Sequence, residues 1–309
     1  MTDSRRPSPG ARHGRAIARR AHGLAMALVA ATAAATIAAC GIGRSAGPSP
    51  TARDIDHPTG GTTVILRLDE GGGFVPPSFF VTQAPAFSLY GDGTVVFRDP
   101  WTQPPPAVDQ VIRSVPFQVV RLSEGEVQAL LATALGPGGL AIAREQYQLP
   151  VADAPTTTFT VVAGGLSKTV SVNGLGIGAD AGADAAVLTA LATLRAQLMG
   201  FGSTVTGATP WVPDRYRGIL MEAYGGGDQP GLVMAWPWPT ITPADFAVPA
   251  GSNGPGWPSR VMTPDDVAAL GLDDLEGGAQ GILLRRPDSV PEGMPYEFAL
   301  RPLLPDESR

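Results

Sequence analysis

The chain has 309 residues, with 28 acidic side chains against 22 basic ones, a formal net charge of −6 at pH 7, three histidines and a single cysteine. Two of the histidines precede residue 23, His57 falls in a polar segment, and no cysteine follows Cys40. The chain after residue 57 therefore lacks the residues of a Ser-His-Asp site, a Cys-His site, a typical zinc site or an internal disulfide. The acidic balance argues against binding to nucleic acid and against electrostatic docking on anionic membranes.

Residues 1–39 have the pattern of an export signal. Six arginines against one acid, Asp3, make a basic start, and the 17 residues from 23 to 39 are uncharged and mostly small. At roughly 1.5 Å per residue such a helix is shorter than a hydrocarbon core of about 30 Å. We therefore expect a signal peptide over residues 1–39 that is removed before the protein functions. The remaining part holds 16 basic and 27 acidic residues, a net charge of −11.

The only cysteine ends this apolar run, in the stretch Ile37-Ala38-Ala39-Cys40. An aliphatic residue three positions before the cysteine and two small residues between them resemble the lipobox of bacterial lipoprotein precursors. The resemblance implies cleavage after Ala39 and a diacylglycerol on the Cys40 thiol, which would anchor the protein to the extracytoplasmic face of the cell membrane. Two or more acyl chains make a stable anchor, whereas one holds only marginally. The alternatives are an ordinary signal peptide with a chance cysteine, or a cytoplasmic protein with an irregular start.

Residues 40–61 are rich in Gly, Pro, Ser and Thr, which predicts a flexible tether. We expect a first α+β domain over residues 62–205. It begins with a strand at 62–69, followed by a hairpin at 87–97 around Gly91-Asp92-Gly93 and a strand at 117–122. Ser123 and Glu126 form a capping box for a helix that ends before Gly136, a second hairpin spans 156–173, and a second amphipathic helix spans 184–198.

Residues 206–309 predict a smaller α+β domain or a second half. Strand-like runs at 215–224 and 231–238 precede a short helix capped by Thr263 and Asp266, and strands at 281–286 and 296–304 end the chain. Hairpins mixed with helices, without regular β-α-β alternation, indicate an α+β fold with mainly antiparallel sheet. The two capped helices match at a constant offset of 140 residues, which suggests a degenerate internal duplication. The alternative is that any α+β chain offers two capped helices.

Four tryptophans within 47 residues, each beside a proline, are the candidate contact residues for a ligand or partner: Trp211, Trp236, Trp238 and Trp257. Exposed tryptophans stack on sugar rings and anchor protein interfaces. The alternative is that they fill the core of the smaller half.

No motif predicts a cofactor, a metal or a catalytic residue. The stretch from Gly174 to Ala179 partly fits a dinucleotide-binding fingerprint, but the strand before it belongs to a predicted hairpin, which favours an ordinary loop. The clusters of acidic residues lack the spacing of a calcium-binding loop. We therefore expect no cofactor, no bound metal and no catalytic site.

The lipobox, together with FSLYGDGTVVF, DAPTTTFTVV and YEFALRPLLPDE, resembles a group of lipoproteins of high-GC Gram-positive bacteria to which no activity is assigned. The resemblance covers most of the chain after Cys40 and transfers only the location. We expect a membrane-anchored extracytoplasmic lipoprotein that acts as a non-catalytic binding or accessory module, with an envelope protein or a glycan as partner. The alternatives are a carboxylate-based hydrolase acting on a glycan, which needs neither histidine nor cysteine, and a structural interaction protein.

Overall fold

The computed structural model describes residues 54–107, 109–177, 182–222, 232–248, 256–285 and 295–307. The predicted signal peptide and Cys40 lie outside the described residues. Residues 52–309 form one compact unit with its own hydrophobic cores, so this folded unit is suited to expression by itself. In the described residues, no helix is long and apolar enough to cross a membrane.

The fold is α+β, as predicted, with two mostly antiparallel sheets and few helices. The first sheet has eight strands and is antiparallel except for its β6–β8 pair. Its strands, in spatial order, are β6 (Gln146–Gln148), β8 (Leu166–Asn173), β7 (Pro155–Ala163), β1 (Val64–Gly72), β2 (Phe87–Tyr90), β3 (Thr94–Phe97), β5 (Gln118–Arg121) and β9 (Thr209–Pro210). The two predicted hairpins are confirmed as β2–β3 and β7–β8.

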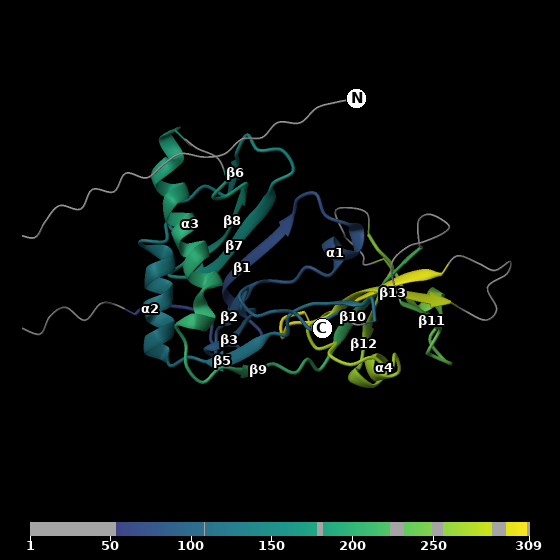
Figure 1. The fold of residues 1–309 in the computed structure, drawn as a ribbon. Coiled ribbons are helices and arrows are strands. Elements are labelled where there is room, and N and C mark those ends of the chain that lie inside the picture. Colours follow the sequence, from purple (N-terminus) through teal and green to yellow (C-terminus); the bar gives the residue numbers. More distant parts are fainter. Residues whose placement is uncertain are drawn as a thin grey trace, which may run out of the picture. The chain divides into compact units, whose positions relative to one another are not determined.

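Two helices lie side by side on one face of this sheet, α2 (Glu124–Leu135) and α3 (Ala185–Met199) (Figure 1). The predicted capping box of α2 is confirmed, because the Ser123 side chain accepts from the Glu126 N–H while the Glu126 carboxylate accepts from the Ser123 N–H. Each helix buries apolar side chains at helical spacing against the inward face of the sheet, which makes the largest core of the described residues. Two short 3-10 helices, η1 (Gly182–Asp184) and η2 (Phe201–Ser203), flank α3.

The second sheet consists of β11 (Leu232–Ala235), β13 (Ala279–Arg285), β14 (Tyr296–Pro302), β10 (Tyr216–Glu222) and β12 (Ser259–Met262), in that spatial order, and the two-residue strand β4 (Ile112–Arg113) also pairs with β13. The β11–β13 pair is parallel. The short helix α4 (Pro264–Ala268) begins at the predicted capping box of Thr263 and Asp266, and the 3-10 helix η3 (Pro243–Asp245) follows β11. The sheets differ in strand number and order, so their likeness is limited to antiparallel pairing and a capped helix.

Each side of the boundary predicted at residues 205/206 contributes a strand to the sheet formed mainly by the other side. β4 comes from the first half of the chain and joins the second sheet, whereas β9 comes from the second half and joins the first sheet. The C-terminal Leu304 is buried against Tyr90, Val96 and Phe117. The short helix α1 (Pro77–Val81), after β1, contacts β13 and β14 of the second sheet. These exchanges tie the two sheets into one compact unit.

The described part of the fold includes residues 54–61 of the predicted tether. The Ile55 N–H donates to the Gln128 side chain over 2.7 Å, and the Gln128 amide donates back to the Ile55 carbonyl over 2.9 Å. The Ile55 side chain packs against the main core, and the His57 ring contacts Glu124. Ile55 and His57 thus lie beside α2, because their apolar and hydrogen-bonding groups find partners there.

Candidate ligand-binding groove

A groove of about 710 Å³ opens where the two sheets meet, which is within the range typical of small-molecule sites. Its walls come from residues 70–75 at the end of β1, from residues 79–86 in and after α1, from residues 98–100 after β3 and from residues 112–115 around β4. Met199 and Gln280 add contacts from α3 and from β13. The lining is predominantly apolar, and segments far apart in the sequence meet in it.

The groove is bordered by apolar side chains that face solvent. Phe74 is 93% exposed and Ile112 is 58% exposed, and both line the groove together with the half-exposed Phe79. Trp101, which is 78% exposed, follows the lining residue Pro100. The most exposed phenylalanine and tryptophan side chains of the described residues thus gather in one region. Apolar surface concentrated around a concavity is typical of a binding site.

Backbone geometry explains why Phe74 faces solvent. β1 ends at Gly72, where φ is +76°, and Gly73 has a φ of +84°. Residues other than glycine rarely adopt a positive φ, so the two glycines allow the chain to turn away from the sheet. The Gln83 side chain accepts from the Gly72 N–H, and α1 begins at Pro77, whose fixed φ suits the first helical turn. The loop that carries Phe74 is therefore held at both ends.

Arg98 is the unusual charge of the groove. It follows β3, its main-chain N–H donates to the Ala86 carbonyl, and the residue is partly buried. The guanidinium carbon lies 4.1 Å from the centre of the Phe117 ring, and Nη2 donates to the Gly277 carbonyl over 2.6 Å. Nε is buried and has no hydrogen-bond partner among the described residues. Burial, and secondly the charge of Arg301, lower the pKa of Arg98 to about 10, so it remains charged at neutral pH.

The second arginine of the groove is already paired. Arg113 donates to both oxygens of the Asp109 carboxylate, over 2.8 and 2.7 Å. This forked geometry is the strong form of an arginine–carboxylate pair. The hydrogen bonds from Arg113, then the one from the Val111 N–H and the charge of Arg113, hold the pKa of Asp109 well below its usual range. Arg113 therefore has its counter-charge within the fold.

The carboxylates that line the groove either accept hydrogen bonds from other groups of the protein or are exposed to solvent. Glu70 accepts from Nε and Nη2 of Arg195. Asp99 accepts from the Trp101 N–H over 2.9 Å and from the Thr102 hydroxyl over 3.1 Å, which closes its own turn. Asp153 is exposed, with a φ of +52°. In the part of the chain that the structure describes, none of these acids forms an ion pair with Arg98.

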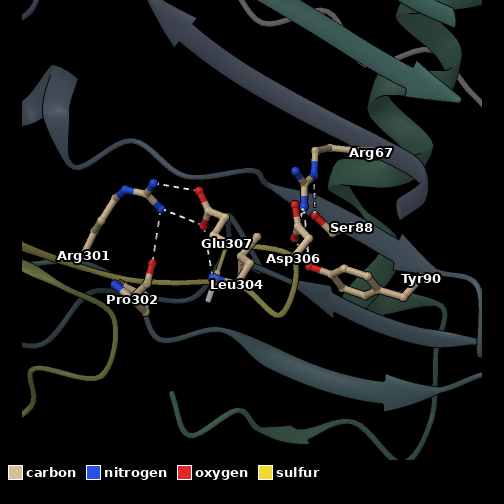
Figure 2. A network of polar contacts seen from close by, with 8 residues as sticks. All are labelled: Arg67, Ser88, Tyr90, Arg301, Pro302, Leu304, Asp306 and Glu307. Atoms are coloured by element: carbon tan, nitrogen blue, oxygen red, sulfur yellow. Dashed lines mark hydrogen bonds and ion pairs between the residues drawn. The ribbon is translucent and has the colours of Figure 1, made fainter. Parts of the chain in front are cut away.

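Outside the groove, arginines and carboxylates pair with one another in a polar cluster that we call the C-terminal clamp. Its members are Arg67, Ser88, Tyr90, Arg301, Asp306 and Glu307 (Figure 2). Arg67 donates to Asp306 over 2.6 Å and to the Ser88 hydroxyl over 3.0 Å. The Tyr90 hydroxyl donates to Asp306 over 2.8 Å. These contacts attach the C-terminal segment to β1 and β2 of the first sheet.

The other half of the clamp holds the same segment to the second sheet. Arg301 on β14 donates to both oxygens of Glu307, over 2.9 and 2.7 Å, and the Leu304 N–H donates to the same carboxylate (Figure 2). Burial alone would raise the pKa values of Asp306 and Glu307. The hydrogen bonds and charges of Arg67 and Arg301 outweigh burial, so both pKa values lie below their usual range.

Asp69 stands apart from these paired acids. Burial raises its pKa from 3.8 to about 6, and the charges of Glu307 and Asp306 add to this effect while Arg67 opposes it. Asp69 lines a smaller cavity of about 320 Å³, together with Glu70. A carboxyl group of this kind suits proton transfer, but its neighbour Glu70 is bound by Arg195.

The four predicted tryptophans do not form one surface. Trp236 and Trp238 meet edge to face at 5.2 Å within the core of the second sheet, where their ring N–H groups donate to main-chain carbonyls. Trp211 packs on Phe117 near the C-terminal segment. Trp257 lies in a separate small core and lines a cavity of about 520 Å³. Trp236 and Trp238 thus belong to the core of the second sheet, whereas Cys40 lies outside the described residues.

Sequence reasoning missed the groove residues Phe74, Arg98 and Ile112, and the exposed Trp101 that follows the lining residue Pro100. Phe74 and Trp101 did carry a signal, because each is a large apolar residue inside a Gly- or Pro-rich segment that lacks strand or helix periodicity. Arg98 carried none, because a sequence does not show which arginine lacks an acidic partner.

Comparison with known protein families, with curated proteins and with solved structures gives no match to this chain. In the described residues, no group of three or more His, Cys, Asp or Glu side chains is placed to hold a metal ion. The assignment of function therefore rests on the geometry of the groove.

Proposed function

We propose that this protein is an extracytoplasmic lipoprotein, anchored to the cell membrane through Cys40, that binds a small apolar ligand in the groove and performs no catalysis on it. The observation that carries the proposal is the apolar concavity of about 710 Å³ bordered by Phe74, Phe79 and Ile112. An exposed apolar surface of this kind costs free energy in water, and a ligand that covers it recovers that cost.

The predicted alternatives are supported less well. A glycan hydrolase needs two carboxyl groups that act together across a substrate, and the clamp acids Asp306 and Glu307 are each bound by an arginine. The Asp69 and Glu70 pair lines a smaller cavity, and Glu70 is also bound by an arginine. A structural interaction protein would use the exposed apolar rim but has no need of the concavity behind it.

The binding proposal is tested by titrating the folded unit, residues 52–309, with the neutral dye N-phenyl-1-naphthylamine, whose fluorescence rises in apolar surroundings. We expect saturable binding, which Phe74→Ser and Ile112→Ser each weaken about tenfold through lost apolar contact. The matched control is Ile142→Ser, because Ile142 is 76% exposed and does not line the groove. Absence of saturable binding, or equal weakening by Ile142→Ser, would refute the proposal.

The anchor is tested separately in the full chain. Cys40→Ser should move the protein out of the membrane fraction or leave an unprocessed precursor, and a labelled fatty acid should no longer be incorporated. A variant that fractionates like the natural protein, with no lipid label in either, would exclude the anchor.

A further inference from the structure

Building on the proposed function, we infer that the ligand is a single-chain amphiphile whose anionic head binds at Arg98 while its apolar chain lies in the groove. The juxtaposition that carries this inference is a partly buried guanidinium, without a carboxylate partner among the described residues, in the wall of a predominantly apolar concavity.

A buried charge without a counter-charge is costly, and proteins normally pair it. Arg98 has only partial compensation, from the Phe117 ring and the Gly277 carbonyl. Nε has no hydrogen-bond partner among the described residues, and the charge of Arg301 repels the Arg98 guanidinium. An anion bound beside the guanidinium would supply the missing counter-charge.

The other charges of the groove do not favour a cationic head. Glu70 has its counter-charge in Arg195, and Asp99 uses both carboxylate oxygens within its own turn. Asp153 is exposed to water, which screens it. The charge that a ligand meets in the apolar part of the groove is therefore that of Arg98.

The geometry favours a carboxylate or a sulfonate-like head over a neutral polar one. A guanidinium offers several donors in one plane, and hydrogen bonds between charged partners are about twice as strong as neutral ones. The apolar walls of the groove, which include Val75, Ala86 and Val115, suit an alkyl chain or aromatic rings. A fatty carboxylate fits this description.

The test compares two dyes that share one ring system and differ by a single sulfonate: neutral N-phenyl-1-naphthylamine and anionic 1-anilinonaphthalene-8-sulfonate. The folded unit should bind the anionic dye at least tenfold more tightly than the neutral dye. Arg98→Gln should remove this preference while the affinity for the neutral dye changes less than about twofold. Arg144→Gln is the matched control, because it alters an exposed arginine outside the groove.

A second arm needs no variant and so remains decisive if Arg98→Gln fails to fold. Dodecanoate should displace the neutral dye from the natural protein at a concentration at least tenfold lower than dodecyltrimethylammonium, which has the same chain and the opposite charge. Equal displacement by the two, or an unchanged preference in a folded Arg98→Gln, would overturn the inference while leaving the groove as an apolar site. Failure of the neutral dye to bind would overturn the proposed function as well.

Discussion

The C-terminal clamp and the groove both place arginines in partly or largely buried surroundings, and they treat the charge in opposite ways. In the clamp, Arg67 and Arg301 each meet a carboxylate of the C-terminal segment within 2.7 Å. In the groove, Arg98 meets an aromatic ring and one carbonyl. The apolar residues differ likewise, since Leu304 beside the clamp is buried whereas Phe74 in the groove is exposed.

This difference underlies the proposal that the clamp is structural and the groove binds a ligand. In the clamp, each arginine has a carboxylate partner within the fold, and these ion pairs join the C-terminal segment to both sheets. An unpaired charge beside uncovered apolar surface gives up stability that a ligand can restore, and such local inconsistencies are expected at functional sites. The comparison predicts effects of different size and sign at the two places.

The largest effect is expected from breaking the clamp. Asp306→Ala leaves the Arg67 guanidinium and the Tyr90 hydroxyl without their acceptor, and we expect the free energy of unfolding to fall by about 3 kcal/mol. Asp184→Ala is the control, because it removes an exposed ion pair worth about 1 kcal/mol or less. Denaturant unfolding measures both, and equal losses would show that the clamp is not structural.

The stability contributed by Asp69 is expected to depend on pH in a way that distinguishes this residue from the clamp acids. Its pKa of about 6 lies above the ordinary 3.8, so the folded state holds the extra proton and stability falls as the pH rises from about 4 to about 6. Asp69→Asn removes this cost and should raise the free energy of unfolding by about 2 kcal/mol at pH 7, with little change at pH 4. Equal effects at both pH values in denaturant titrations would contradict the pKa assignment.

The clamp acids should give the opposite dependence on pH. The pKa values of Asp306 and Glu307 are lowered in the folded state, so their stabilisation is present above pH 4 and is lost as the pH falls further. In the Asp69→Asn background, unfolding titrations should therefore show a loss of stability only on the acid side. Persistence of full stability well below pH 4 would show that the clamp carries little of it.

A smaller effect is expected at Arg98. Arg98→Met removes an unpaired charge but also its contacts with Phe117 and Gly277, so we expect the free energy of unfolding to stay within about 1 kcal/mol of the natural value. Arg301→Met, in the clamp, should cost clearly more, because it leaves Glu307 buried without its partner. Similar losses in the two variants would abolish the distinction drawn between the two regions.

The smallest effect is expected at the rim. Phe74→Ser replaces a side chain that is already 93% exposed, so unfolding should change by less than about 0.5 kcal/mol. Phe87→Ser, in the fully buried core, should cost several times more or prevent folding. A large loss from Phe74→Ser in thermal unfolding would show that the rim is part of the core.

Local chemistry made much of the fold predictable. The capping box at Ser123, the glycine turn between β2 and β3 and the long β7–β8 hairpin depend on residues close together in the sequence. The pairing of β4 with β13 depends instead on contacts between residues more than 160 positions apart, and no local pattern marks a two-residue strand. The class of fold therefore followed from the sequence, whereas the exchange of strands did not.

The site was less predictable than the fold. Tryptophan was the reasonable residue type to suspect, but Trp236 and Trp238 are amphipathic enough to fill a core once a carbonyl accepts from the ring nitrogen. Arg98 differs from Arg67 only in what surrounds it after folding. Which charge is left without a partner is a property of the tertiary structure.

The most direct test of the account is a crystal structure of residues 52–309 with dodecanoate bound. We predict an alkyl chain in the groove beside Phe74 and Ile112, with its carboxylate within hydrogen-bonding distance of the Arg98 guanidinium. A ligand that lies elsewhere, for example in the cavity beside Trp257, with the groove left empty, would contradict the account.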